Sequence, residues 1–184
     1  EMILSKRAAW GDLEHMLGQV RAELPAVPLT VTEAFAEFLN HADAKPVLAQ
    51  MDFLMANVHP IFEPWFRTAH AGNWADFVAK VSDLLAGVFL GPVLIKETGI
   101  PTGPPTLNFM PAMQRDFYRA LEKRFSQTAT RAFSYFSAFD APWRISDAVV
   151  GGGLHPEEAH WGLFDANRAP KDVMRDFPTL PKAR

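Results

Sequence analysis

The stretch Pro92-Val-Leu-Ile-Lys-Glu97-Thr-Gly-Ile-Pro101 runs from an apolar, β-branched segment directly into a carboxylate and then into a turn. This pattern predicts a buried strand over residues 92–97, followed by a loop rich in proline and glycine. In parallel α/β proteins the chemistry lies at the carboxyl ends of the strands. A carboxylate is costly to hold there without a partner, so Glu97 is a candidate functional residue. Because successive strand residues alternate between faces, we expect Lys96 to point away from Glu97.

Strand and helix patterns alternate on both sides of this stretch. Further strands are predicted over residues 29–34, 53–59 and 132–140. Amphipathic helices are predicted over residues 8–24, 38–51 with a break near Pro46, 73–88 with Asn73 as N-cap, 110–125 and 171–177. The alternation predicts a parallel sheet in one domain over residues 1–184. Four strands are too few for a closed barrel, which needs eight strands and ~250 residues, so an open sheet is the alternative.

Composition excludes several classes of protein. The 184 residues carry a net charge of −3, from 18 Lys and Arg against 21 Asp and Glu, so no nucleic-acid partner is expected. The absence of cysteine excludes disulfides and thiolate nucleophiles, and the histidines show no metal-ligand spacing, so no metal is expected. The sequence begins with Glu1 rather than Met, and we expect it to be a piece of a longer or processed chain.

Polar residues follow the apolar run of each predicted strand. They are Glu33, Asn57 with His59, Glu97 and Asp140. The carboxyl ends of parallel strands meet at one edge of the sheet, so these residues predict a polar cleft there. Two carboxylates that flank a bond are typical of glycoside cleavage, and a retaining enzyme holds them ~5 Å apart. A serine or cysteine hydrolase of the α/β class is disfavoured, because the sequence has no G-x-S-x-G motif.

Four motifs resemble those of glycoside hydrolase family 17. The stretch Lys96-Glu97-Thr-Gly-Ile-Pro101 resembles its nucleophile motif ETGWP, with Ile100 in the place of Trp. Asn57-Val-His-Pro-Ile-Phe62 resembles N-x-Y-P-x-F, with His59 in the place of Tyr. Phe139-Asp-Ala-Pro-Trp-Arg144 resembles FDExWK, and residues 158–164 resemble E-x-x-(F/W)-G-L-F. The motifs occur in the family's order across residues 53–165.

The resemblance implies a (β/α)8 TIM barrel of which this chain covers strands five to eight, the C-terminal half. The missing N-terminal half is expected in another segment or another chain. The implied activity is retaining cleavage or transfer on β-1,3-glucan, with Glu97 as nucleophile, Glu1 as acid/base and no cofactor. For Glu1 the alternative is a terminal residue without a role. The resemblance is to bacterial members, which suggests a location outside the cytoplasm or at a membrane.

The same resemblance favours a glucanosyltransferase. The alternatives are a hydrolytic endo-β-1,3-glucanase and a non-catalytic glucan-binding half-barrel. The third alternative is suggested by Ala141, which stands where the family has a glutamate, while Arg144 replaces the family's lysine. Trp65 and Trp143 follow strand ends and are candidates for stacking on sugars, whereas Trp161 is expected to be structural. The expected substrate-binding residues are Glu33, Asn57, His59, Trp65, Tyr135, Phe139, Trp143, Arg144 and Glu158, with core packing as the alternative for Tyr135.

Overall fold

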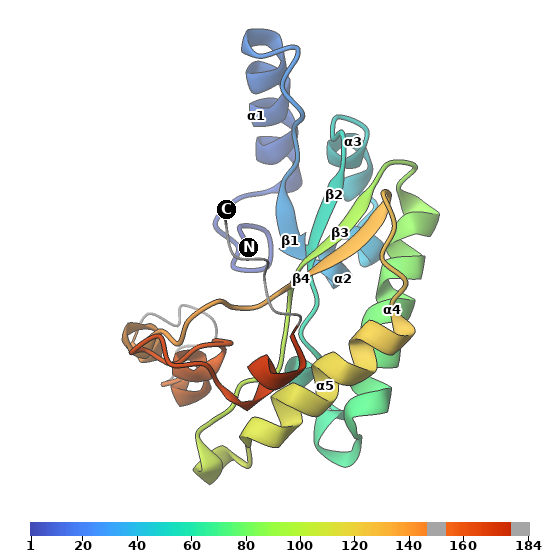
Figure 1. Ribbon diagram of the computed structural model, residues 1–184. Coiled ribbons are helices and arrows are strands. Elements are labelled where there is room, and N and C mark those ends of the chain that lie inside the picture. Colours follow the sequence, from blue (N-terminus) through green and yellow to red (C-terminus); the bar gives the residue numbers. More distant parts are fainter. Residues whose placement is uncertain (147–153, 178–184) are drawn as a thin grey trace, which may run out of the picture.

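The sheet is parallel, as the alternating pattern predicts. The computed structural model describes residues 1–146 and 154–177, so the glycine-rich stretch 151–153 lies outside the described residues. The described strands are β1 (Thr32–Ala34), β2 (Leu54–Asn57), β3 (Val93–Thr98) and β4 (Arg131–Tyr135), in the order β1-β2-β3-β4. All neighbouring pairs are parallel, and the four strands lie side by side in chain order (Figure 1).

One helix precedes the first strand, and the others connect consecutive strands. The helices are α1 (Trp10–Glu23), α2 (Phe35–Asn40), α3 (Ala44–Leu48), α4 (Ala71–Val88) and α5 (Pro111–Arg124). In Figure 1, α4 and α5 lie along one side of the sheet, the N-terminal turn lies on the other, and the red segment near the C-terminus lies next to α5. Short 3₁₀ helices include Pro60–Phe62 and Phe66–Thr68 after β2, and Asp172–Asp176 in the C-terminal segment.

Several predicted boundaries are wrong for local reasons. Helix α4 begins before Asn73, because the His70 ring Nδ1 accepts a hydrogen bond from Gly72 N (3.2 Å) and caps the helix. Pro46 lies inside the first turn of α3, where its missing N–H costs nothing. Strand β1 is three residues long, and β4 ends at Tyr135 rather than at Asp140.

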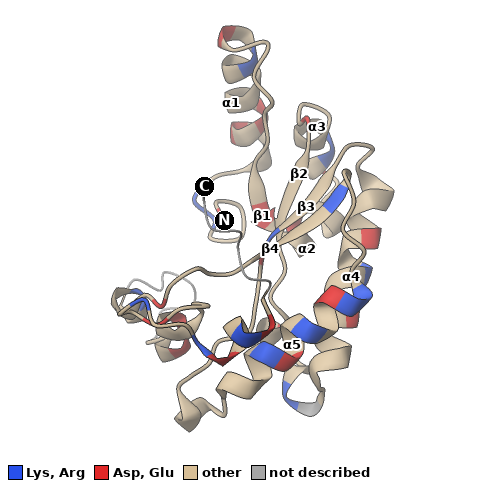
Figure 2. Ribbon diagram, viewed as in Figure 1, with Lys and Arg blue, Asp and Glu red and all other residues tan. Residues whose placement is uncertain are grey.

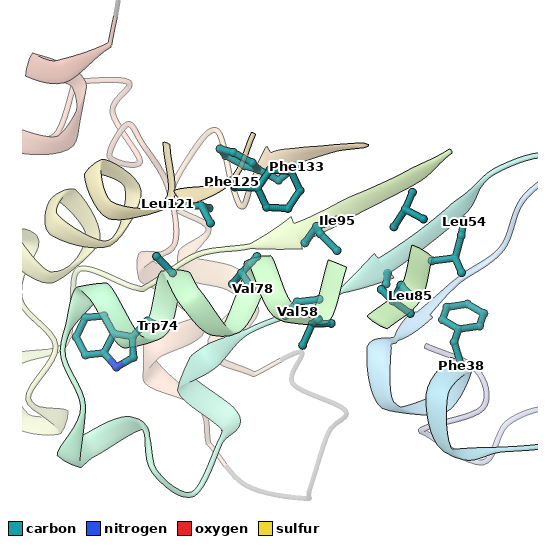
Figure 3. Packing of buried hydrophobic residues seen from close by; sticks show 14 of the residues in the cluster. Phe38, Leu54, Val58, Trp74, Val78, Leu85, Ile95, Leu121, Phe125 and Phe133 are labelled. Atoms are coloured by element: carbon teal, nitrogen blue, oxygen red, sulfur yellow. The ribbon is translucent and has the colours of Figure 1, made fainter. Parts of the chain in front are cut away.

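The core lies between the sheet and helices α4 and α5. Leu85 and Val78 of α4 and Ile95 of β3 are completely buried. Figure 3 shows Val78 and Leu85 of α4 facing residues of the strands, with Leu121, Phe125 and Phe133 continuing the same layer. Trp74, at the start of α4, packs on Phe66 of the loop after β2. This packing fixes the position of β3 and therefore of the residues at its carboxyl end.

A β-bulge interrupts β3 at Lys96 and Glu97. From Ile95 to Thr98 the strand advances three residues, while the partner strand β4 advances two, from Phe133 to Tyr135. A bulge re-aims the side chains next to it and breaks the alternation of faces. The prediction that Lys96 points away from Glu97 is therefore wrong, and the Lys96 Nζ lies 2.6 Å from Glu97 Oε1.

Glycine is required where β3 leaves the sheet. A Cβ atom at Gly99 would lie 2.4 Å from Phe136 O and 2.8 Å from Tyr118 Oη. The Tyr118 hydroxyl occupies this place because it donates to Thr98 O (3.0 Å) or Phe136 O (3.2 Å). The Thr-Gly pair after Glu97 thus allows α5 to bind the ends of β3 and β4 together.

Ion pairs hold the C-terminal segment against α5. Arg115 contacts Asp172 and Asp176 at 3.1 and 2.9 Å, and Arg119 contacts Asp176 at 2.6 Å. Figure 2 shows blue and red segments together where α5 meets this segment, and basic and acidic residues mixed elsewhere on the ribbon. A second pair, Lys171 with Asp140 (2.5 Å), is more buried, so Asp140 is an anchor for the C-terminal segment rather than a strand-end residue of the cleft. Among residues 1–146 and 154–177, no helix has the length and hydropathy needed to cross a bilayer.

Two neighbouring leucines of α4 test this packing. Leu85→Ala should lower the free energy of unfolding by about 2–5 kcal/mol, because its side chain is completely buried and its removal leaves a cavity. Leu84→Ala is the matched control, since Leu84 is 57% exposed, and its effect should stay within about 0.5 kcal/mol. Urea denaturation measures both variants, and equal effects would contradict the packing of α4.

Candidate active site

A cleft of about 550 Å³ opens at the carboxyl ends of the four strands. Each strand supplies a residue at or just after its end, namely Ala34, Asn57, Glu97 and Phe136. The other lining residues come from the N-terminus and from the loops: Glu1, Leu4, Phe35, His59, Phe62, Glu63, Arg144, His155, Glu158 and Trp161. The polar cleft predicted for this edge of the sheet is therefore present.

Glu97 lies in this cleft with a partner on each carboxylate oxygen. Its Oε1 accepts a hydrogen bond from Lys96 Nζ at 2.6 Å, and its Oε2 lies 3.6 Å from His59 Nε2. The Glu97 side chain is 22% exposed. Burial is the largest single influence on its pKa and acts to raise it, but the neighbouring His59 ring and Lys96 ammonium together outweigh it. The net effect lowers the pKa of Glu97 from 4.5 to about 2, so the carboxylate is ionised at neutral pH.

Glu1 lies in the same cleft and is held by two other elements. Its Oε1 accepts a hydrogen bond from Asn57 Nδ2 at 3.1 Å. Asn57 pairs with Glu97 across β2 and β3, so one amide connects Glu1 to the neighbourhood of Glu97. The next residues are fixed by Glu33, whose Oε1 accepts from Met2 N (2.5 Å) and Ile3 N (3.1 Å). The structure thus brings both carboxylates that were predicted to be catalytic to one cleft.

His59 is held in an aromatic cage. Its ring lies 4.9 Å from Trp161, 5.2 Å from Phe136 and 5.8 Å from Phe62, measured between centroids. These contacts aim Nε2 at Glu97 and bury Nδ1, which has no hydrogen-bond partner among the described residues. Trp161 is 2% exposed, so it is structural as predicted and at the same time forms part of the cleft wall.

Arg144 and Glu158 form an ion pair in the cleft wall. Arg144 Nε and Nη2 both donate to Glu158 Oε2, at 3.1 and 2.7 Å. The guanidinium also lies over the Phe136 ring, 5.3 Å from its centroid. Two residues from separate family-like motifs therefore neutralise each other beside the cleft.

Other predicted residues are not brought to the cleft. Glu33 is 1% exposed and binds the N-terminal backbone, so the expectation of a substrate contact is wrong. Tyr135 points toward α5, where its hydroxyl donates to Glu122 at 2.6 Å and its ring packs on Tyr118 and Phe177. The alternative of core packing is therefore the correct one for Tyr135, which is the last residue of β4.

The stacking candidates from the loops also lie elsewhere. Trp65 packs edge-on against Phe77 of α4, with ring centroids 5.1 Å apart. Phe139 packs on Phe164 beyond the strand end, and Trp143 is 65% exposed. The described lining of the cleft includes none of these three rings.

Sequence reasoning missed part of the cleft wall. Phe62 is the last residue of the N-x-Y-P-x-F-like motif and Glu63 follows it, so the place of Phe62 in that motif could have indicated this part of the wall. Burial raises the pKa of Glu63. No sequence pattern indicates that Phe35, the first residue of α2, or Phe136 and His155, which follow β4, reach the cleft. No group of three or more acidic or histidine side chains suited to a metal ion occurs in residues 1–146 and 154–177.

Residues 1–162 match a family model of glycoside hydrolase domains. That model is the BtgE/BtgC glycoside hydrolase domain, and the chain belongs to this family. Among curated proteins, none matches the sequence.

Solved structures of glycosidases share the fold. An active-site mutant of a β-1,3-glucanosyltransferase from Rhizomucor miehei, in complex with laminaritriose, superposes with a TM-score of 0.68 at 22% identity, over 94% of this chain and 60% of the other. The glycoside hydrolase family 17 β-1,3-glucanosyltransferase from the same organism gives 0.64 at 22% identity, over 90% and 57%. An endo-laminarinase from Formosa Hel1_33_131 gives 0.65 at 18% identity, over 89% and 51%.

These comparisons confirm the resemblance to glycoside hydrolase family 17 and the α/β fold of glycosidase barrels. The chain spans between half and three fifths of the length of the three solved structures.

The low pKa of Glu97 makes a prediction for stability. A carboxyl whose pKa is depressed by folding stabilises the protein above its unfolded value of 4.5, and this contribution is lost as the pH falls through about 2. The Glu97→Gln variant lacks this titration. Between pH 5 and pH 2 wild type should therefore lose up to about 3 kcal/mol of unfolding free energy relative to the variant. Denaturant titrations at several pH values measure the difference, and a difference that stays constant would contradict the ionised pair.

Proposed function

We propose that this chain is part of a retaining glycosidase that acts on β-1,3-glucan, with Glu97 as nucleophile and Glu1 as acid/base. The observation that carries the proposal is that both carboxylates line one cleft at the carboxyl ends of the strands. In this proposal, residues 1–184 form one domain that supplies strands five to eight of a (β/α)8 barrel. The laminaritriose complex of a similar structure supports a β-1,3-glucan as the substrate.

The chemistry would proceed in two displacements. In the first, an oxygen of Glu97 bonds to the anomeric carbon of the sugar while Glu1 gives its proton to the departing glycosidic oxygen. In the second, Glu1 accepts the proton of the incoming hydroxyl, which attacks the anomeric carbon and releases Glu97 as a carboxylate. The ionised state of Glu97 suits a nucleophile.

The described cleft offers groups for binding the glucan. Phe62 is 61% exposed and lines the cleft, so its ring can pack against the apolar face of a sugar. Asn57, His59, Arg144 and Glu158 provide polar atoms for hydroxyl groups. The acceptor in the second displacement would be another glucan, because the similar structures include β-1,3-glucanosyltransferases. Water as acceptor would make the protein an endo-glucanase instead.

A non-catalytic glucan-binding role is the rival. It is favoured by Ala141, which stands where the family resemblance places a glutamate. Binding of laminarin without release or transfer of oligosaccharides by wild type would establish the rival and exclude the catalytic proposal.

Glutamine variants of the two carboxylates test the assigned roles. Glu97→Gln should lower the turnover of laminari-oligosaccharides by about 10³–10⁶-fold, because it removes the nucleophile. Glu1→Gln should lower that turnover strongly but should spare kcat/KM for an aryl β-glucoside with an acidic phenol, because the first displacement on this substrate needs no proton. The control is Glu14→Gln, an exposed glutamate of α1, which should retain full activity. An equal fall in kcat/KM for the oligosaccharide and for the aryl glucoside in Glu1→Gln would contradict the acid/base role.

The lengths of the products show whether the acceptor in the second displacement is glucan or water. Wild type incubated with a laminari-oligosaccharide of defined length should give products longer than the substrate if glucan is the acceptor. Mass spectrometry over the time course detects them. Only shorter products, including at high substrate concentration, would contradict transfer and support hydrolysis.

A further inference from the structure

Lys96 is placed against the nucleophile candidate by the bulge in β3. On a regular strand neighbouring side chains would lie on opposite faces, but the extra residue between Ile95 and Thr98 brings Lys96 and Glu97 together. The backbone of Lys96 is held from β4, because Ser134 Oγ donates a hydrogen bond to Lys96 O. The contact is therefore built into the pairing of two strands.

The two oxygens of Glu97 are not equivalent. Oε1 has the short contact, 2.6 Å to the ammonium of Lys96, and Oε2 has the longer contact, 3.6 Å to His59 Nε2. Both side chains are partly shielded from solvent, with 36% of Lys96 and 22% of Glu97 exposed. Oε2 is thus the oxygen more readily available to an incoming carbon atom, while Oε1 stays bound to a cation.

We propose that Lys96 is a positioning residue that acts through Glu97, holding Oε1 so that Oε2 bonds to the sugar and stabilising the carboxylate when that bond breaks. The proposal rests on the function proposed above and gives a role to Lys96, which stands one position before the glutamate of the ETGWP-like motif.

The two displacements place opposite demands on Lys96. When the C1–Oε2 bond forms, the carboxylate becomes a neutral ester and its attraction to the ammonium weakens, so Lys96 slows this step. When the acceptor oxygen attacks C1, the C1–Oε2 electron pair returns to Glu97 and the ion pair is restored, so Lys96 accelerates this step. The proton of the acceptor goes to Glu1, and Lys96 keeps its own proton throughout. Lys96 therefore favours breakdown of the glycosyl-enzyme over its formation.

Steady-state and burst kinetics of Lys96→Met test this assignment. With an aryl β-glucoside that carries an acidic phenol, kcat should fall about 10-fold or more while kcat/KM changes by less than about 3-fold, since kcat/KM reports only the first displacement. A burst of phenol equal to the enzyme concentration should appear, because the intermediate accumulates. Lys96→Arg retains the charge and should show no burst.

A merely structural role would give a different result. If Lys96→Met lowered kcat and kcat/KM by the same factor, or left both unchanged, the proposal would be overturned. The remaining titratable groups of the cleft, namely Glu1, His59, Glu63, Arg144, His155 and Glu158, are the same in all variants.

A titration that needs no turnover separates this proposal from the proposed function. Carbon-13 NMR of labelled glutamate carboxyls follows Glu97 directly, with Glu97→Gln used to assign its signal. The titration midpoint of Glu97 should rise in Lys96→Met and stay low in Lys96→Arg. An unchanged midpoint would overturn the pairing. If wild type fails to turn over any glucan, the proposed function fails, but a raised midpoint would still establish the pair.

Discussion

A carboxylate that is mostly surrounded by protein stays charged only if nearby donors replace the water that it has lost, and the site depends on this condition at Glu97. Lys96 of β3 and His59, which lies two residues after the end of β2, provide these donors. The first is aimed by a bulge and the second by a cage of three aromatic rings. The local irregularity of β3 and the aromatic packing around β2 therefore serve the same end, which is to keep one side chain ionised and oriented.

The support for that arrangement comes from the helix layer. Tyr118 reaches from α5 to the carbonyl groups that follow Glu97 and Tyr135, and Gly99 leaves room for its hydroxyl. Gln114 of the same helix donates to Trp161 O at 3.1 Å and to Gly162 O at 3.3 Å, so α5 also fixes the loop that carries the cage tryptophan. One helix thus coordinates three segments of the cleft without contributing a side chain to its lining.

The sequence predicts the parts of this fold that follow from periodic burial. Strand and helix patterns give the parallel sheet, and the motif around Glu97 gives the strand that carries the nucleophile candidate. The bulge in β3 could not be predicted, because the sequence Lys-Glu is compatible with a regular strand. The bulge is seen only in how β3 pairs with the neighbouring strands β2 and β4. Tyr135 is misplaced for a related reason, since an aromatic residue in the middle of a strand suits either face. Phe35 and His155 could not be predicted as cleft residues, because the course of the chain after β1 and after β4 depends on tertiary packing.

Glu33 controls the place of Glu1 although it lies outside the cleft. Its carboxylate binds the backbone N–H groups of Met2 and Ile3, more than two dozen residues earlier in the chain, and so fixes the direction in which the chain leaves Glu1. The acid/base candidate therefore owes its alignment to a neighbouring strand. In a mutational scan, substitution of Glu33 would therefore abolish activity. The cause would be a misplaced Glu1 rather than a lost contact with sugar.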